Sequence, residues 1–299
     1  MAQKIKIVTH SGKFHTDDVF AVATLQHVFE DTEVIRTRDD AAVRSGDVVV
    51  DVGNVYSVSQ KRFDHHQPEG AGVRKNGIPY ASFGLVWEVY GEEICGDKEI
   101  AKSIDQVLVQ PIDAGDNGVD LCTSCFSRVF PYTVGSIVDL FRPTHTEGED
   151  YDAAFVRAVE WAKWVIIREV EITQDALAGK SLVESFYREA PDKQVVVFDK
   201  TNALGRELTT SFLIKYPEVL YAVLYRKDID SWQVVALNES EGTYRVRKPL
   251  PESWAGKGES ELQKVTGVTD AIFCHKGRFM AVTKSKEGAL KLAQLALDA

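Results

Sequence analysis

The chain has 299 residues, of which 44% are apolar and 27% are charged. This composition is typical of a globular protein, and the length predicts two domains, because one hydrophobic core seldom serves so long a chain. The formal net charge of −10 at pH 7 argues against broad nonspecific binding of nucleic acid, which needs clustered lysines and arginines, although a local basic groove is still compatible with it.

The four cysteines are too few and too scattered for a disulfide framework: Cys95, Cys122, Cys125 and Cys274. Cys122 and Cys125 are spaced like two zinc ligands, but a second pair is missing, so we expect reduced thiols. The sequence passes at once into the apolar run 5–8 without the regions of a signal peptide, and it contains no stretch of 18 apolar residues. We therefore expect a cytoplasmic protein with no membrane partner.

The first part of the chain predicts a strand followed by a helix. Residues 4–9 are rich in β-branched side chains and end at polar residues, whereas residues 17–30 carry apolar side chains at helical spacing. In open α/β sheets, ligands bind in the loop between a strand's carboxyl end and the next helix. This loop contains four candidate ligands: His10, His15, Asp17 and Asp18.

Two further strands are predicted at 33–38 and 47–53. The second is continuously apolar, which is typical of a strand covered on both faces, and it ends near Asp51. Three adjacent ionisable residues follow: Asp64, His65 and His66. An isolated histidine pair is more often one exposed ring and one satisfied core ring. Here the pair is one of several such polar stretches, which favours a shared site.

A helix is predicted at 82–90, with Gly91 ending it, and a helix, or a helix and a short strand, at 99–109. Residues 111–118 are rich in aspartate, glycine and asparagine, which is typical of a turn. A single turn of this kind needs no function. This one contains Asp113 and is the fourth acidic loop of an α/β pattern, so we include it among the candidates.

The rest of the chain predicts a helical linker at 147–190 and a smaller α+β domain at 191–299. Strands of that domain are expected at 194–198, 220–225, 232–237 and 271–273, and helices at 207–216, 259–266 and 287–297. We therefore predict an α/β protein whose N-terminal domain, 1–146, contains a mostly parallel sheet flanked by helices.

The candidate ligands combine imidazole with carboxylate and include no thiolate: His10, His15, Asp17, Asp51, Asp64, His65, His66 and Asp113. Such a set suits manganese, magnesium or iron better than a structural zinc ion. It has more carboxylates than one ion needs. Two ions about 3.5 to 4 Å apart, bridged by one carboxylate, would use the set, and such a pair is a common clamp for phosphoryl transfer.

Four ordered motifs resemble the metal motifs of the DHH phosphoesterase superfamily: His10-Ser-Gly-Lys-Phe-His15-Thr-Asp17-Asp18, Val50-Asp51-Val52-Gly53, Asp64-His65-His66 and Ile112-Asp113-Ala114-Gly115-Asp116-Asn117-Gly118. That superfamily includes RecJ nucleases, oligoribonuclease-like phosphodiesterases and manganese-dependent family II pyrophosphatases. Further signatures at 82–87, 247–251, 254–256 and 273–278 extend the resemblance over nearly the whole chain. More narrowly, the chain resembles the Myg family of DHH-type 3′ to 5′ exonucleases.

The resemblance implies two divalent cations, either manganese or magnesium. It implies one ion on His10, His15 and Asp51, and a second on Asp17, Asp51, His65 and Asp113, with Asp51 bridging. The wider superfamily has His-x3-Asp-x-Asp, whereas this chain has one extra residue and His15 in place of the first aspartate. Asp18 is an alternative to Asp17, or else a carboxylate favoured by the helix N-terminus.

The resemblance also implies the chemistry. A water activated by the ions would attack phosphorus in line, with RNA or a short oligonucleotide as the substrate. The implied catalytic residues are Asp51, Asp64, His65 and His66, and His66 would face the substrate phosphate. The C-terminal domain, 191–299, would bind the substrate through residues suited to phosphate: Arg247, His275 and Arg278.

Two alternatives stay open. A manganese-dependent pyrophosphatase or small phosphoanhydride hydrolase would use the same metals, but it would need a closed cleft rich in lysine and arginine, and the C-terminal signatures contain few. A non-catalytic metal- or nucleotide-binding regulator is expected to lack a ligand, whereas all four motifs keep ligand-competent residues. The sequence leaves open RNA against DNA and the oligomeric state, a homodimer included.

Overall fold

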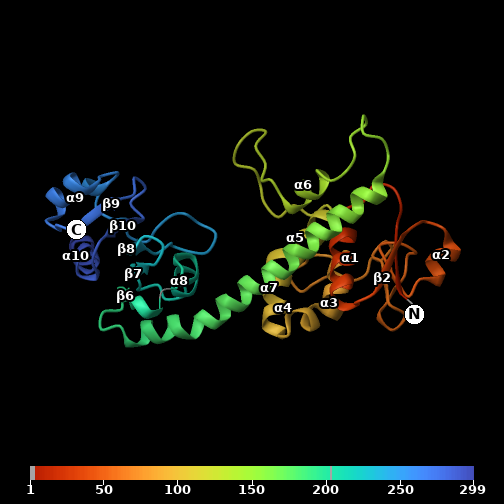
Figure 1. Ribbon diagram of the computed structural model, residues 1–299, viewed down its shortest axis with the longest axis horizontal. Helices are drawn as coiled ribbons and strands as arrows, with labels where there is room; N and C mark the ends of the chain where they lie inside the picture. The colour runs from red at the N-terminus through yellow and green to blue at the C-terminus, as the bar shows by residue number, and fades with distance from the viewer. Residues whose placement is uncertain (1–3, 203) are drawn as a thin grey trace. The chain divides into compact units, whose positions relative to one another are not determined.

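The computed structural model describes residues 4–202 and 204–299, and the chain divides after Gln174 into two compact units (Figure 1). The long helix α7, Tyr151–Glu189, starts in the first unit and ends in the second. Helix is thus present where the sequence predicts a helical linker, while the assignment of separate functions to the two parts stays a prediction. Within the described residues, no helix is both long enough and apolar enough to cross a membrane.

The sheet of the first unit has the strand order β2-β1-β3-β5-β4. Its strands are β1 Ile5–Thr9, β2 Thr32–Arg36, β3 Val48–Val50, β4 Tyr56–Ser57 and β5 Arg62–Phe63. The pairs β1–β2, β1–β3 and β3–β5 are parallel, and β4–β5 is antiparallel. The sheet is therefore mostly parallel, as the sequence predicts.

Strand β1 lies between β2 and β3, although the chain passes from β2 to β3 without returning through β1. The segment after β1 therefore leads to one side of it, and β3 lies on the other. In open α/β sheets, the carboxyl ends of the strands at such a switch point form a ligand-binding crevice. His10 and Asp51 directly follow β1 and β3, so the topology places both at this crevice.

Helices cover both faces of this sheet, which explains the continuously apolar β3. The helices are α1 Thr16–Val28, α2 Asp40–Ser45, α3 Ser82–Cys95, α4 Lys98–Ile104, α5 Gln110–Asp116 and α6 Val134–Asp139, with a 3₁₀ turn η1 at Val58–Gln60. On one face, Val43 of α2 packs against Val8 and Val49. On the other, Tyr90 of α3 contacts Phe63, and α3 packs along α1.

The helix α3 is longer than predicted. The sequence predicts that Gly91 ends it, but the helix continues to Cys95 and is followed by Gly96 at φ 66°. Gly91 serves packing instead, because a Cβ atom there would lie 2.8 Å from the ring of Trp87. That ring is buried and donates its Nε1–H to the Ala101 carbonyl at 3.0 Å, which joins α3 to α4.

Residues 111–118, predicted as a turn, belong mostly to α5. The chain passes from α4 through a π-helical turn, η2 at Asp105–Val109, directly into α5, and Pro111 lies in the first turn, where its missing N–H does no harm. The turn comes at the end, where Asn117 Nδ2 donates to the Asp113 carbonyl at 2.9 Å. Asp113 and Asp116 therefore lie on one helix, three residues apart.

The second unit contains a mixed sheet with the strand order β6-β7-β8-β10-β9. Its strands are β6 Val195–Val197, β7 Tyr221–Arg226, β8 Ser231–Ala236, β9 Ala271–Cys274 and β10 Met280–Thr283. Its helices are α8 Arg206–Leu213, α9 Glu259–Thr266 and α10 Lys286–Asp298, with 3₁₀ turns η3 at Lys200–Asn202 and η4 at Glu252–Trp254. The predicted strands and helices are present with shifted ends, and β10, too short for a periodic pattern, was not predicted.

Two apolar clusters lie on the two faces of this second sheet. One joins the sheet to α9 and α10 through Leu262 and Leu292. The other joins it to α8 and the end of α7 through Leu213 and Val183. Burial on both faces gives this unit its own core.

Candidate metal centre

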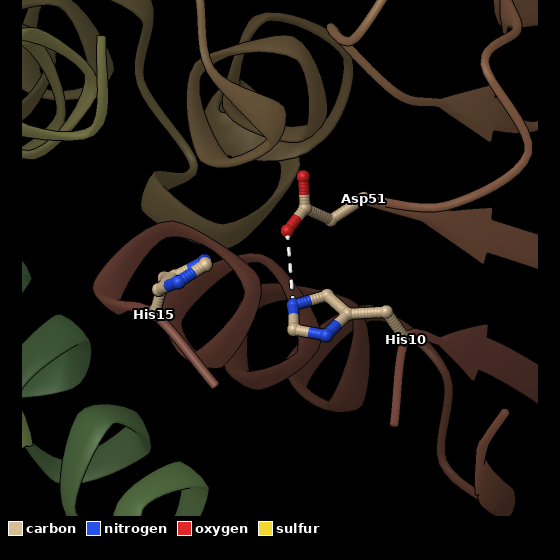
Figure 2. A group of neighbouring side chains, drawn as sticks. All are labelled: His10, His15 and Asp51. Carbon is tan, nitrogen blue, oxygen red and sulfur yellow. Dashed lines mark ion pairs between the residues drawn. The ribbon is translucent and has the colours of Figure 1, made fainter. Parts of the chain in front are cut away.

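The ends of β1 and β3 bring His10 and Asp51 together. Their side chains point toward one another (Figure 2), with His10 Nε2 3.3 Å from Asp51 Oδ2, and both are almost completely buried. Asp51 has a φ of 56°, so the chain turns sharply at the end of β3. Its N–H donates to the Phe63 carbonyl at 3.1 Å, which fixes the turn against β5. Backbone geometry thus holds the Asp51 carboxylate in the crevice.

The start of α1 supplies three more polar groups. Asp17 and Asp18 are fully buried, whereas His15, directly before the helix, is exposed. Asp18 Oδ1 accepts the His15 N–H at 2.9 Å, and Asp18 Oδ2 lies 3.1 Å from His10 Nε2. Asp18 is therefore both a carboxylate that caps the helix and a neighbour of the candidate ligands, and the structure brings both aspartates to the crevice.

The loop that carries His15 is fixed by two arginines. Arg142 Nε donates to the Phe14 carbonyl at 2.8 Å, and Arg36 Nη2 donates to the Gly12 carbonyl at 2.6 Å. The ring of Phe14 is fully buried between these arginines and the ring of Phe155. Arginine donors and aromatic packing therefore order a loop that has no regular secondary structure.

The three residues after β5 have different surroundings. Asp64 is buried, and its carboxylate accepts the N–H of Asn54 at 2.5 Å and His66 Nδ1 at 2.7 Å. His65 Nε2 points into the crevice, 3.4 Å from Asp51 Oδ1 and 3.8 Å from Asp17 Oδ2. The His66 side chain is 53% exposed. Asp64 thus orients the segment, and the two histidines face the crevice and the solvent.

The helix α5 offers a different aspartate from the one that the resemblance implies. Asp116 Oδ2 lies 3.2 Å from His65 Nε2. Asp113 is fully buried in a separate pair, where its Oδ2 lies 2.7 Å from Arg74 Nη1 and its Oδ1 accepts the Gly84 N–H at 3.0 Å. The resemblance implies no role for Asp116, although that residue belongs to the same motif. The structure brings Asp116, and not Asp113, to the other candidate ligands.

A serine also belongs to the site and was not predicted as part of it. Ser82 Oγ donates to Asp51 Oδ1 at 2.9 Å, and its N–H donates to Asp17 Oδ2 at 3.3 Å. Because Ser82 begins α3, the positive end of that helix faces two buried carboxylates. The sequence offered one signal, since Ser82 opens one of the signatures of the resemblance.

The crowding of acidic groups shifts the pKa values of the histidines. Burial opposes the protonation of His10, but Asp18 and Asp51 outweigh it and raise the pKa to about 10. Burial likewise opposes the protonation of His65, and Asp116 and Asp51 raise its pKa to about 10. Without another cation, both rings therefore carry a proton that balances the carboxylates.

The carboxylates respond in opposite directions. Burial, followed by repulsion from Asp51 and Asp116, raises the pKa of Asp17 well above its usual value. Burial also opposes the ionisation of Asp51, but His10 and His65 outweigh it and lower the pKa. Burial raises the pKa of Asp18 as well. Protons on the two rings and on the buried carboxylates thus compensate the crowding of acidic groups, and a divalent cation would take the place of these protons.

Several buried polar atoms in the crevice have no hydrogen-bond partner among the described residues: His10 Nε2, Asp17 Oδ1, Asp18 Oδ2 and His65 Nε2. These atoms approach one another in ion pairs, such as His10 Nε2 and Asp18 Oδ2 at 3.1 Å, but without hydrogen-bond geometry. Buried polar atoms without a hydrogen bond are rare in proteins, and a shared cation would satisfy them. Three overlapping groups place one potential ligand atom per residue within 4.8 Å of one another: His10, His15 and Asp51; Asp51, His65 and His66; His15, Asp17 and Asp116. The residues present therefore fit divalent cations.

Comparison with known proteins adds the family. The sequence matches, over residues 6–297, the family model MYG1_exonuc, described as an uncharacterised protein family (UPF0160). The chain belongs to this family. It is 28% identical to the MYG1 protein C694.04c of Schizosaccharomyces pombe, which covers 100% of this chain and 99% of that protein. The narrower family named from the sequence is thereby confirmed.

Other MYG1 relatives are similar over comparable lengths. The protein named MYG1 exonuclease from Homo sapiens is 27% identical over 98% of this chain and 85% of its own length. The MYG1 protein of Chlamydia pneumoniae is 29% identical over 98% of this chain and 96% of its own length. No solved structure matches the chain.

In this MYG1 chain, two cavities adjoin the candidate ligands. One, of about 320 Å³, is lined by His10, His15, Asp51 and His66 and also by Arg38. The other, of about 470 Å³, is lined by His15 and Asp116 together with apolar residues of α5 and the turn before it. Each cavity thus contains candidate ligands, and Arg38 is a cation suited to phosphate in the smaller one.

The predicted substrate-binding residues lie in the second unit of the MYG1 chain. Arg247 donates to the carbonyls of Ile214, Tyr216 and Val219, so its guanidinium stabilises the end of α8. His275 and Arg278 share the turn between β9 and β10, where Arg278 has a φ of 56° and its N–H donates to the His275 carbonyl. The structure brings His275 and Arg278 together and commits Arg247 to the backbone.

Proposed function

We propose that this MYG1 protein is a divalent-metal-dependent phosphodiesterase of the DHH superfamily, and specifically a 3′ to 5′ exonuclease on RNA or short oligonucleotides. One observation carries the proposal. Buried histidine and aspartate atoms without hydrogen-bond partners converge at the switch point of a mostly parallel sheet. The family supports it, because several relatives carry the name exonuclease.

We assign the ligands from the geometry. The first ion would be held by His10, His15 and Asp51, whose ligand atoms lie within reach of one ion. The second would be held by Asp17, His65 and Asp116, with Asp51 shared between the ions. Imidazole and carboxylate ligands favour manganese, with magnesium as the second choice. Asp113 is left out, because its carboxylate is already paired with Arg74.

Two bound ions would supply an activated water and neutralise charge on the scissile phosphate. The residues of this chain prepare the site for them. Ser82 holds the Asp51 carboxylate through its Oγ–H, and Asp64 holds the His66 ring through Nδ1. The half-exposed His66 forms no further side-chain hydrogen bond within the described chain, so its Nε2 is free to donate to a phosphate oxygen.

Three basic residues are candidates for contacts with the substrate: Arg38, His275 and Arg278. Arg38 lines the smaller cavity beside His10 and His66, where it could neutralise a phosphate. His275 and Arg278 keep their assignment as substrate-binding residues, whereas the backbone contacts of Arg247 favour a structural role. A cytoplasmic location, the lack of a membrane partner and a homodimer stay predictions from the sequence.

Hydrolysis of short end-labelled RNA and DNA tests the proposal, with pyrophosphate assayed in parallel and manganese added back to the chelated protein. We expect stepwise shortening from the 3′ end that depends on manganese. Asp51→Asn should abolish it while leaving the fold intact, because both ions lose a ligand. Pyrophosphate cleavage without oligonucleotide cleavage would support a pyrophosphatase instead, and wild-type activity in Asp51→Asn would sink the two-ion mechanism.

A further inference from the structure

The second unit contains a cavity of about 460 Å³ between the start of α8 and the β7–β8 hairpin. Cavities of this size bind small molecules. Its lining is mainly charged, with Arg206, Arg226 and Lys227 alongside Glu207 and Asp228. All of its lining residues lie within 204–233, so it shares none with the metal centre described above.

One residue of the lining, Gln233, is polar at a position of the sheet where its neighbours are apolar. Gln233 of β8 pairs with Leu224 on one side and Val282 on the other, and both neighbours are buried apolar residues. Gln233 is itself only 4% exposed, and it lines the cavity. No hydrogen bond joins its side-chain amide to any residue that the structure describes. The Gln233 side chain is thus largely buried, and its amide is available to a ligand as a donor and an acceptor.

Two of the three cations of the lining are paired with carboxylates that an anion could displace. Arg206 Nε donates to Glu207 at 3.1 Å, and Arg226 Nε donates to Asp228 at 3.2 Å. The carboxylate side chains are 77% and 61% exposed, and ion pairs at that exposure contribute little to stability. A phosphate group offers two negative charges and a better match to the guanidinium forks.

The start of α8 adds neutral donors to the same cavity. Gly205 precedes the helix and provides no side chain to cap it, and both Gly205 and Arg206 line the cavity. The first N–H groups of a helix form hydrogen bonds with anions. Here the Glu207 carboxylate meets its own backbone N–H, and a bound anion would replace this exposed carboxylate. Phosphate therefore has two kinds of donor here, the guanidinium groups and the backbone N–H groups. Gln233, on the strand β8, adds a neutral amide to the same cavity.

We propose that this cavity binds a mononucleotide. The phosphate contacts Arg206, Arg226 and the start of α8, and the edge of the base contacts the Gln233 amide. Inorganic phosphate alone would leave most of the volume and the amide unused. An amide that both donates and accepts matches the edge of adenine, so AMP is the probe of choice. This site goes beyond the proposed nuclease activity and does not depend on it.

Calorimetric titration of the full chain with AMP, adenosine and inorganic phosphate, in the presence of a chelator, tests the proposal. We expect AMP to bind more tightly than adenosine or inorganic phosphate. Gln233→Leu matches the size of its apolar neighbours and should weaken AMP about tenfold without changing the binding of phosphate. Arg226→Gln should weaken both AMP and phosphate.

Two exposed residues of the same unit provide matched controls: Gln194→Leu and Arg245→Gln. Neither should change any of the three titrations, and thermal melting should show that all four variants are folded. The proposal is overturned if AMP binds no better than inorganic phosphate. It is equally overturned if AMP binding is unchanged in both Gln233→Leu and Arg226→Gln, because AMP then binds elsewhere.

Discussion

His65 Nε2 lies 3.2 Å from Asp116 Oδ2, whereas Asp113, on the same helix, is paired with Arg74 at 2.7 Å. The two aspartates of one motif therefore have different tasks. Asp116 is partly exposed toward the crevice, and Asp113 is fully buried behind α3. Burial raises the pKa of Asp113 to about 7 even though Arg74 opposes the rise. The inner aspartate anchors the helix, and the outer one is available to a cation.

The first prediction separates these tasks by manganese titration. Asp116→Asn keeps the shape of the side chain but removes a negative ligand, so we expect the number of tightly bound manganese ions to fall from about two to about one. The free energy of unfolding of the metal-free protein should change little, because removing Asp116 also removes repulsion with Asp17. Electron paramagnetic resonance of free manganese gives the stoichiometry directly.

Asp113→Asn is the matched variant. It removes one of the two carboxylates that pair with the buried Arg74 guanidinium and leaves Asp105 at 3.1 Å, so we expect a loss of roughly 2 kcal/mol of stability in urea denaturation. Both manganese ions should still bind to the folded protein. The opposite pattern, with one ion lost in Asp113→Asn and two kept in Asp116→Asn, would restore Asp113 as the ligand and refute the assignment made from the structure.

The sequence could locate this site because its signals are local. A β-branched run that ends in a polar residue, as at His10, or an apolar run that ends at Asp51, is visible without any knowledge of the fold. Parallel strands then place both ends at one edge of the sheet. For the same reason, the helix predicted at 17–30 is present at Thr16–Val28. The strand predicted at 47–53 is present but shorter, because the chain leaves the sheet after Val50.

The rest of the site depends on contacts between distant segments. A sequence rich in glycine and asparagine predicts a turn, and a turn gives no reason to prefer Asp116 over Asp113. The choice follows from the helical form of α5 and from Arg74, 39 positions earlier, which occupies Asp113. Ser82 likewise meets Asp51 because α3 packs along α1. Pairings of this kind leave no periodic pattern in the sequence.

The second prediction concerns the glycine that lets Asp113 approach α3. A Cβ atom at Gly84 would lie 1.9 Å from Asp113 Oδ2 and 2.6 Å from Arg74 Nη2. Alanine has no rotamers, so the ion pair of Asp113 and Arg74 would have to move to relieve this clash. Gly84→Ala should therefore cost about 3 kcal/mol or more in urea denaturation. Gly115→Ala, in α5 with open space around it, is the control and should stabilise by about 0.5–1 kcal/mol. Equal effects of the two substitutions would refute the role given to Gly84.

The third prediction distinguishes a structural Arg247 from a substrate-binding one. Arg247→Ala removes the donors of three backbone carbonyls near the end of α8, so we expect a loss of about 3 kcal/mol in stability. Arg245→Ala, whose side chain is 77% exposed, should change stability by less than about 0.5 kcal/mol. Activity per folded molecule should be similar in both. Normal stability and a raised KM in Arg247→Ala would show that Arg247 binds the substrate instead.

The fourth prediction concerns protons. The pKa values of His10 and His65 are raised to about 10 by neighbouring carboxylates, so both rings are protonated at pH 7.5 when no cation is bound. Their contribution to the stability of the metal-free protein is fully present below pH 6.5 and is lost as the pH rises through about 10. A metal ion needs the lone pair of a neutral ring. Manganese binding at pH 7.5 should therefore release about two protons from these rings, and manganese affinity should rise with pH.

Calorimetry in buffers with different ionisation enthalpies counts the released protons. His10→Gln should release about one proton fewer than the wild type at pH 7.5, because one imidazolium is missing. His145→Gln replaces an exposed histidine outside the site and should leave the count unchanged. Since burial raises the pKa of Asp17 as well, the wild-type count should increase further toward acidic pH. A count near zero at pH 7.5, or one that His10→Gln does not change, would show that manganese does not replace the proton on His10.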